Sequence, residues 1–115
     1  MSRKGEEMNM NRWSHEHMGG ETRTWMSAFF KALADETRLK ILCALLESGK
    51  CVMHISERVG MSQSAVSHQL SILKRADLVK VSRNGKNQVY SIADEHVRLV
   101  LDMAQLHVNE KIGRP

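Results

Sequence analysis

The chain has 115 residues, of which 42% are hydrophobic, and its formal net charge is +4 at pH 7. This length supports one small domain, and the hydrophobic content with its dispersed charge excludes an intrinsically disordered chain. No apolar run is long enough to cross a bilayer, and the first residues lack the apolar stretch of a secretory signal, so we expect a cytoplasmic protein without membrane contact.

The N-terminal residues 1–22 are polar and rich in Met, Asn, Glu and Gly. We interpret them as a mobile arm with a hinge at Gly19 and Gly20. A folded domain is then expected over residues 23–111, followed by a short tail over 112–115.

The first helix of the domain is expected over residues 24–35, where Trp25, Phe29 and Leu33 recur at helical spacing. Asp35 is placed to cap the helix that follows.

This second helix is predicted to stop at Gly49, and Cys43 inside it is predicted to be a buried thiol. Its buried stripe is expected to consist of leucines, namely Leu39, Leu42, Leu45 and Leu46.

Two short helices follow, separated by a tight turn. Val52, Ile55 and Val59 mark the first, and Gly60 supplies the turn after it. Ser62 can cap the second helix, whose inner face is Val66, Leu70 and Leu73. This pattern is typical of a helix-turn-helix.

The outer face of that second helix carries short hydrogen-bonding side chains: Gln63, Ser64, Ser67, His68 and Ser71. Such side chains suit the reading of base edges in a DNA major groove better than the Lys and Glu of ordinary solvated helices do. We therefore predict double-stranded DNA as a partner.

Residues 78–92 are predicted to form a β-hairpin with Asn84 and Gly85 as the two turn residues. Its tip carries side chains suited to gripping phosphates or entering a minor groove: Arg83, Asn84, Lys86 and Asn87. A helix-turn-helix followed by such a hairpin is a winged helix, so the predicted fold is mainly α with one small β-hairpin.

The charge is concentrated over residues 58–92, which carry six Lys and Arg residues against the single acid Asp77, a balance of 6 − 1 = +5. Such a segment suggests a polyanionic partner, and a solvated basic face is the alternative.

The last helix is expected from about Asp94 to Lys111, and it divides into three stripes. A stripe predicted to face water holds Arg98, Asp102, Gln105 and Asn109. A stripe predicted to face the core holds Val97, Leu101, Ala104 and Val108. The third stripe mixes histidines with apolar residues: His96, Leu99, Val100, Met103, His107 and Glu110.

His96 and His107 are eleven residues apart, which places them on nearly the same face but about 16 Å apart along the helix axis. Asp94 with His96, and His107 with Glu110, therefore form two halves of a tetrahedral shell that one chain cannot close around one ion. Asp94 and His96 converge only if Asp94 lies at the helix N-cap.

An antiparallel pair of these helices in a homodimer would bring unlike halves together and make two equivalent sites. Two imidazoles and two carboxylates suit a divalent ion, zinc first, and hydrogen bonding across the interface is the alternative interpretation. The apolar residues of the third stripe are those that such an interface through the terminal helices would bury.

These motifs resemble the ArsR/SmtB family of bacterial metal-sensing repressors over about residues 24–111. "SQSAVSHQLSILKRADLV" is similar to its recognition helix and the entry to the wing, and the spacing of Asp94, His96, His107 and Glu110 is similar to the zinc motif of its zinc-sensing branch. The resemblance implies a homodimer that binds operator DNA when metal-free and releases it on binding zinc, with cobalt, nickel and cadmium as alternative ions.

The chain departs from this family where many members carry Cys-x-Cys, because it has Cys51 followed by His54. A second candidate metal site would combine these two residues with His15 and His17 of the arm. The alternatives are a softer ion such as Cu(I) at that site, or a partly buried thiol beside a disordered arm. Asp77 replaces a glycine usual in the family, and we expect it to adopt the left-handed conformation.

A winged-helix regulator that responds to another signal, such as oxidation of Cys51, is the rival function, with the histidines then purely structural. An enzyme is not expected, because four protein ligands leave a tetrahedral ion no place for a reactive water.

Overall fold

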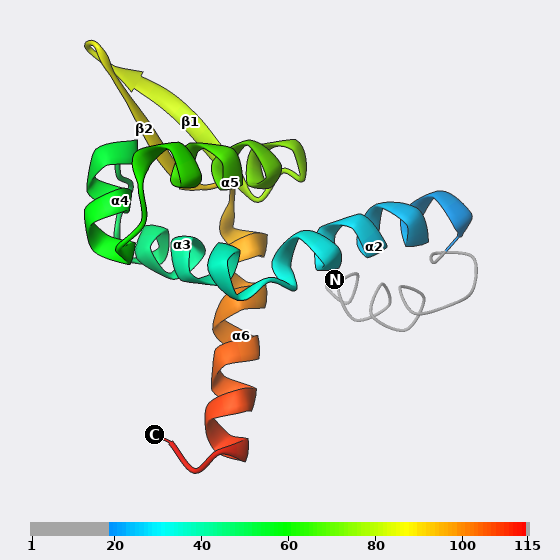
Figure 1. Ribbon diagram of the computed structural model, residues 1–115. Coiled ribbons are helices and arrows are strands. Elements are labelled where there is room, and N and C mark those ends of the chain that lie inside the picture. The colour runs from blue at the N-terminus through cyan, green and yellow to red at the C-terminus, as the bar shows by residue number, and fades with distance from the viewer. Residues whose placement is uncertain (1–18, 115) are drawn as a thin grey trace, which may run out of the picture.

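The computed structural model describes residues 19–114 and confirms the predicted winged helix-turn-helix, which is mainly α with one β-hairpin. Helices α3, α4 and α5 gather beneath the hairpin, whereas α2 and α6 extend away from them in two directions (Figure 1). The elements are α2 (Gly20–Leu33), α3 (Glu36–Glu47), α4 (Val52–Val59), α5 (Gln63–Arg75), β1 (Val79–Asn84), β2 (Asn87–Ile92) and α6 (Glu95–Lys111).

The hydrophobic core lies among α3, α4, α5 and the base of the hairpin. Its fully buried side chains come from all of these elements: Ile41, Leu42, Leu45, Ile55, Val66, Leu70, Leu73 and Leu78. The inner face predicted for the second helix of the helix-turn-helix is therefore confirmed.

The tight turn between α4 and α5 follows the predicted chemistry. Gly60 ends α4 in the left-handed conformation, with φ of 74°, and its N–H donates to the Ser56 carbonyl oxygen at 2.9 Å. The Ser56 hydroxyl donates to the Met61 carbonyl oxygen, and the Ser62 hydroxyl accepts from the Ala65 N–H at 3.1 Å. These bonds satisfy backbone groups that the two helix ends leave open.

The hairpin forms, but its turn is one residue later than predicted. Asn84 pairs with Asn87, so the two turn residues are Gly85 and Lys86. Gly85 has φ of 67° and Asn84 does not have a positive φ. Glycine at the first turn position and no positive φ at the second are the requirements of a type II′ turn, which replaces the Asn-Gly type I′ turn that the sequence suggested.

The loop between α3 and α4 joins the hairpin in a way that the sequence pattern did not indicate. Lys50 and Tyr90 exchange two backbone hydrogen bonds of 2.9 and 2.8 Å, which form an isolated antiparallel β-bridge beside β2. A Cβ atom on Gly49 would lie 3.1 Å from Val89 Cγ1 and 3.2 Å from the Tyr90 carbonyl oxygen. A side chain at position 49 would therefore require small shifts of Val89 or of the β2 backbone.

The α2 helix starts at Gly20, four residues before the predicted start, so the last residues assigned to the arm are helical. Of its 14 residues only Ala32 and Leu33 are buried, and Trp25 is 66% exposed. The predicted stripe of Trp25, Phe29 and Leu33 therefore packs on the core only at its C-terminal end.

The α3 helix buries a different stripe from the one predicted. Ile41 and Ala44 join Leu42 and Leu45 in the core, whereas Leu39 is exposed and Leu46 is half-buried. Cys43 is exposed, which contradicts its prediction as a buried thiol.

Leu39 and Cys43 are exposed because the face of α3 turned toward α6 is only partly covered. It forms one side of a groove of about 280 Å³ between the two helices. The groove is lined by Leu39, Cys43, Leu46, Leu101, Ala104, Gln105, Val108 and Asn109.

The α6 helix meets the core with its first turns alone. Val97 and Leu101 are buried as predicted, whereas Ala104 and Val108 are exposed because the helix has by then passed beyond the core. The stripe predicted to face water is also partly wrong. Arg98 is half-buried and donates to the Leu46 carbonyl oxygen at 3.2 Å, and two other members of that stripe line the groove with α3.

Candidate metal half-sites and DNA-reading face

The junction of β2 and α6 brings Asp94 and His96 together. Asp94 is the N-cap residue of α6, with an extended backbone, and its Oδ1 accepts from the Val97 N–H at 3.0 Å. The same Oδ1 lies 3.8 Å from His96 Nδ1, and the two side chains are 56% and 92% exposed. Donor atoms bound to one tetrahedral ion at about 2.1 Å lie about 3.4 Å apart, so this pair is close together but about 0.4 Å wider than two ligands of one zinc ion.

The other half of the predicted ligand set lies near the far end of the same helix. His107 and Glu110 are both exposed and occupy positions i and i+3, which are neighbours on a helix surface. Within residues 19–114 no three His, Cys, Asp or Glu side chains converge on one point. Within residues 19–114, one chain therefore presents two separate pairs of candidate ligands instead of one centre.

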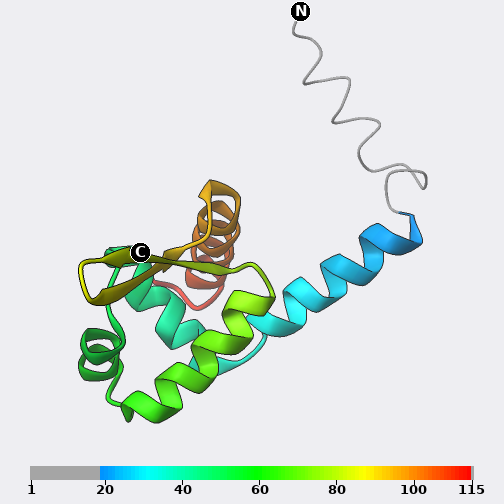
Figure 2. The same cartoon turned by 90° about the horizontal axis from the view of Figure 1, so that it is seen from above.

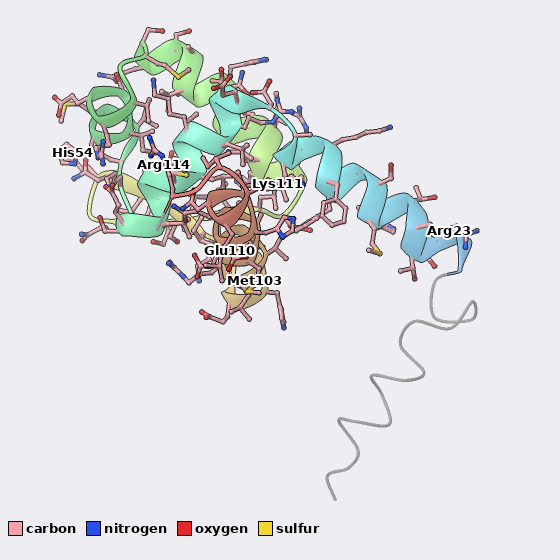
Figure 3. The ribbon with its side chains drawn as sticks, turned by 90° about the horizontal axis from the view of Figure 1, so that it is seen from below. Arg23, His54, Met103, Glu110, Lys111 and Arg114 are labelled. Atoms are coloured by element: carbon pink, nitrogen blue, oxygen red, sulfur yellow. The ribbon has the colours of Figure 1, made fainter. Side chains whose placement is uncertain are left out.

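The surface between the two half-sites is apolar. Leu99, Met103 and Leu106 are all at least half exposed, and Met103 is 61% exposed between the positions of the two histidines. Figure 3 shows Met103 and Glu110 along the same helix, with His54 far away on α4. A large exposed apolar surface on a small chain marks an interface.

The second candidate metal site is represented by only two residues. Cys51 is the half-buried N-cap residue of α4, and His54 is exposed one turn later. His15 and His17 lie outside the described residues. Cys43 and Cys51 are both free thiols.

The side chains predicted to read DNA form an exposed reading face on α5, made up of Gln63, Ser64, Ser67, His68 and Ser71. The opposite side of α5 holds the buried Val66, Leu70 and Leu73. The helix is thus fixed to the core by one face and presents the other.

The wing tip is likewise exposed at all four predicted positions: Arg83, Asn84, Lys86 and Asn87. The hairpin is anchored at its base, where Val79 pairs with Ile92 and the Ala93 N–H donates to the Leu78 carbonyl oxygen at 3.0 Å. Asp77 has φ of 59°, which confirms the expected left-handed conformation at the entry to the wing.

Two arginines of this arrangement were given no individual role by the sequence analysis, which counted Arg75 only in the basic segment over residues 58–92. Arg75 continues the stripe of Ser64, His68 and Ser71 at a spacing of four, three and four residues, and a longer helical wheel would have found it. Arg38 donates from Nε to the Ala32 carbonyl oxygen at 2.7 Å and from Nη1 to Gln69 Oε1 at 3.3 Å. No sequence signal points to that pairing, because the partners are set by the tertiary fold.

An ion pair between α3 and α4 perturbs two titratable groups. Hydrogen bonds from the Arg58 guanidinium, together with its charge, hold the pKa of the Glu47 carboxyl below its usual value, and the same contact raises the pKa of Arg58. Lys50 Nζ lies 3.5 Å from the same carboxylate.

Within residues 19–114 no helix has the length and apolar character needed to cross a membrane.

The chain is similar to known regulators. Residues 35–81 match the family described as "Bacterial regulatory protein, arsR family". The chain is 44% identical to the "Transcriptional repressor SmtB homolog" of Synechocystis sp. over 74% of its own length and 64% of that protein, so it spans just under two thirds of this relative. It is 43% identical to the "HTH-type transcriptional regulator NmtR" of Mycobacterium tuberculosis over 71% of its own length and 68% of that protein.

A solved structure supports the same relationship. The homodimeric winged helix-turn-helix DNA-binding domain of a Mycobacterium bovis protein superposes with a TM-score of 0.80 at 29% identity. The superposition covers 87% of this chain and 93% of that domain.

Proposed function

Because this chain belongs to the ArsR/SmtB family of bacterial regulatory proteins, whose members are DNA-binding regulators rather than enzymes, we propose that it is a zinc-responsive transcriptional repressor. In this proposal a homodimer binds operator DNA through α5 and the wing, and leaves it when zinc binds between the two α6 helices. The observation that carries the proposal is the pairing of Asp94 with His96 at the N-cap of α6, with His107 and Glu110 near the end of the same helix.

The DNA-binding part of the proposal is supported by the shape and chemistry of one face. Gln63, Ser64 and Ser67 begin α5, where a recognition helix contacts base edges. Their amide and hydroxyl groups donate and accept hydrogen bonds, as major-groove reading requires. Arg83 and Lys86 at the wing tip supply charge for flanking phosphates.

The zinc part is supported by the donor chemistry. Two neutral imidazoles and two carboxylates are borderline ligands that suit zinc, and four protein ligands complete a tetrahedral shell. Asp94 and His96 would come from one subunit, and His107 and Glu110 from the other. When bound, the ion supplies a cross-link between subunits. Cobalt, nickel and cadmium fit the same donor set with different preferences in geometry.

The position of the half-site suggests how the two ligands oppose each other. Asp94 lies two residues after Ile92, the last residue of β2, which pairs with Val79 at the base of the wing. A constraint at this half-site therefore reaches the wing through two residues of backbone. Because coupling is reciprocal, DNA would weaken zinc binding by the same factor as zinc weakens DNA binding, typically about 5–150-fold.

The test replaces a ligand while keeping the helix cap. Asp94→Ser retains a capping hydroxyl for the Val97 N–H but removes the carboxylate. We expect it to bind operator normally without zinc, and we expect the effect of zinc on its operator affinity to fall to about onefold. Asp102→Ser, an exposed carboxylate on another face of α6, is the matched control and should behave as wild type. Fluorescence anisotropy on a labelled operator duplex, with and without zinc, measures both.

Normal release of the Asp94→Ser and His107→Ala variants by zinc would show that the regulatory site lies elsewhere. Calorimetric titration then separates the rival function, because a regulator that responds to oxidation of Cys51 would not bind zinc stoichiometrically through these residues.

A further inference from the structure

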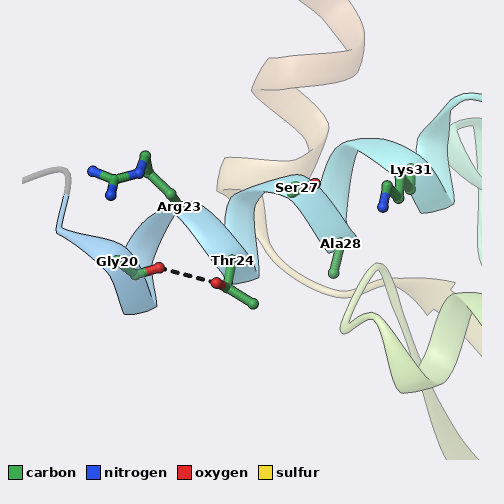
Figure 4. A pocket seen from close by; sticks show the side chains of 6 residues that line it. All are labelled: Gly20, Arg23, Thr24, Ser27, Ala28 and Lys31. Atoms are coloured by element: carbon green, nitrogen blue, oxygen red, sulfur yellow. Dashed lines mark hydrogen bonds between the residues drawn. The ribbon is translucent and has the colours of Figure 1, made fainter.

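The α2 helix has a polar, basic face that the proposed function does not yet use. Arg23, Ser27 and Lys31 follow one another at spacings of four residues, with Thr24 and Ala28 beside them. Together with Gly20 they line a shallow hollow of about 570 Å³ along the helix (Figure 4). The Thr24 hydroxyl donates to the Gly20 carbonyl oxygen at 3.0 Å, so one hydroxyl is held against the helix.

The opposite face of α2 is apolar. At 100° per residue, Trp25, Phe29 and Leu33 lie about 120–160° around the helix from Lys31. Leu33 is buried in the core of its own chain, whereas Trp25 is 66% exposed. A second copy of the chain that covers Trp25 therefore leaves the basic face in solvent. The two faces suit two different partners.

The basic face continues onto the recognition helix. A second hollow of about 380 Å³ lies between α2 and the end of α5, and it shares Ala28 and Lys31 with the first. Its other lining residues are Ala32, Arg38, Ile72, Arg75 and Ala76. Seen from above, α2 extends outward from the C-terminal end of α5 (Figure 2). Since Arg75 also lies on the stripe of Ser64, His68 and Ser71, the reading face and the α2 face form one surface.

Arg38 holds the two helices in this relation. Its guanidinium donates to the carbonyl oxygens of Lys31 and Ala32 at 3.2 and 2.7 Å, which end α2, and to Gln69 Oε1 of α5 at 3.3 Å. Its side chain is 16% exposed. The backbone that carries Lys31 is thereby fixed beside the recognition helix, instead of being free to swing away.

The charged residues that line the two hollows are basic. They are Arg23, Lys31, Arg38 and Arg75, with no acid among the lining residues that the structure describes. Arg38 is mostly buried and lies 4.0 Å from Asp35 Oδ2, so its charge is offset by that carboxylate. Lys31 and Arg75 are exposed, and neither has an ion pair with any residue between 19 and 114. Lysines, arginines and hydroxyls on the outside of a helix that does not enter a groove are the chemistry of phosphate contacts.

We propose that this α2 face, together with Arg75, is a second DNA-binding surface that contacts the phosphate backbone outside the base pairs read by α5. The inference rests on the proposed DNA-binding function and extends its footprint. It assigns α2 two roles on two faces, dimer contact on one and backbone contact on the other. The added contacts are independent of base sequence, so they lengthen the bound duplex without lengthening the recognised sequence.

The experiment compares two duplex lengths. A site is first selected by the zinc-free, full-length protein from a randomised duplex library. The protein is then titrated with the shortest duplex that retains the selected sequence, and with the same duplex extended at both ends by about one helical turn of arbitrary sequence. Affinities are measured over a series of salt concentrations for wild type, Lys31→Gln and Arg75→Gln. Lys40→Gln is the control, because Lys40 is exposed on α3 and lines neither hollow.

Wild type should bind the extended duplex more tightly and with a steeper salt dependence. Lys31→Gln should lower the slope of log K against log salt by about 0.9 per lost phosphate contact, so by about 1.8 for a dimer. This loss should appear on the extended duplex and not on the short one. At moderate salt we expect a loss of roughly threefold to tenfold on the extended duplex. Arg75→Gln should affect both duplexes, because it lies at the boundary of the two surfaces.

Equal affinity of wild type for the two duplexes would overturn the inference while leaving the repressor function intact. Equal losses for Lys31→Gln on both duplexes, or a matching loss for Lys40→Gln, would also overturn it, because the effect would then be one of total charge. If the selection enriched no sequence at all, the DNA-reading function itself would fail, which is a distinguishable result.

Discussion

The two ends of the chain differ from its middle in how far a single subunit completes them. Between α3 and the hairpin, every element buries an apolar face: Leu42, Ile55, Leu70 and Leu78 are all inaccessible to solvent. In α2 and α6, Leu33, Val97 and Leu101 are buried, but several other large apolar side chains are exposed, with Trp25 and Met103 as the extreme cases. The region from α3 to the hairpin is completed within one chain, whereas α2 and α6 leave apolar side chains that the proposed homodimer would cover.

In the proposed function the two regions have different roles. The reading face and the wing are positioned by contacts within one chain, so their geometry does not need a metal. Of the candidate metal ligands on α6, Asp94 and His96 lie where the helix meets the core, and His107 and Glu110 lie beyond it. In the proposed function, the meeting of the two pairs depends on how two chains pack. In the proposed function, zinc bound between the two α6 helices would change the spacing of the two reading faces without unfolding either of them.

The largest effect is expected from a charge introduced into the exposed apolar stripe of α6. Met103→Glu places a carboxylate in the middle of the apolar stripe of α6. Burial of each methionine contributes about 1.5–3 kcal/mol, and a two-fold interface contains it twice, so we expect the dimer to weaken by about 3–6 kcal/mol. Sedimentation velocity over a range of protein concentrations measures the shift to monomer.

The monomeric Met103→Glu variant should keep the fold of its middle region, which circular dichroism would report. Gln105→Glu, on another face of the same helix, is the matched control for the added charge. A dimer that persists in Met103→Glu would show that the α6 stripe is not the interface.

A cavity in the core between α3 and the hairpin should lower stability by an amount that does not depend on dimerisation. Leu70→Ala removes a fully buried side chain on the inner face of α5, and we expect it to cost about 2–5 kcal/mol of unfolding free energy. The cost should be independent of protein concentration, because this contact is made within one chain. Urea unfolding at two concentrations, with the exposed Ser71→Ala as control, tests this. A cost that varied with concentration would mean that the core of the reading head is completed by the partner.

Where one chain decides the structure, local sequence patterns were sufficient. The caps at Asp35, Ser62 and Asp94 and the left-handed turns at Gly60 and Asp77 each depend on residues close in sequence, and each is confirmed. One local prediction was wrong, because the hairpin turn lies at Gly85 and Lys86 instead of Asn84 and Gly85. The errors in burial came where packing between distant elements decides. The exposure of Cys43 depends on how much of α3 is covered by α6, and helical periodicity does not report that.

For the candidate site too, contacts between residues close in sequence could be predicted and contacts between distant residues could not. The approach of Asp94 to His96 could be predicted because it follows from an N-cap, which is a local structure. The tie from Arg38 to Gln69 spans 31 positions and could not. The meeting of the two metal half-sites is a statement about two chains, and for that reason it stays a prediction.

The smallest effect is expected for the exposed ion pair between α3 and α4. The Arg58 guanidinium donates from Nε to Glu47 Oε1 at 3.1 Å and from Nη2 to Oε2, joining the end of α3 to α4. The pKa of Glu47 is lowered by this contact, so its stabilisation is complete above the unfolded-state pKa of about 4.3 and is lost as the pH falls through the lower folded-state value. Both groups are exposed, so salt should screen the effect.

Glu47→Gln should therefore lower Tm slightly at pH 7 and low salt, and the difference from wild type should shrink as the pH is lowered from about 5 toward 3. Glu57→Gln, an exposed carboxylate on α4 with no ion pair to a described residue, should leave Tm nearly unchanged over the same range. Thermal unfolding followed by circular dichroism at two ionic strengths supplies the comparison. A Tm difference that stayed constant with pH would assign the effect to lost packing between α3 and α4, because a packing contribution does not titrate with the carboxylate.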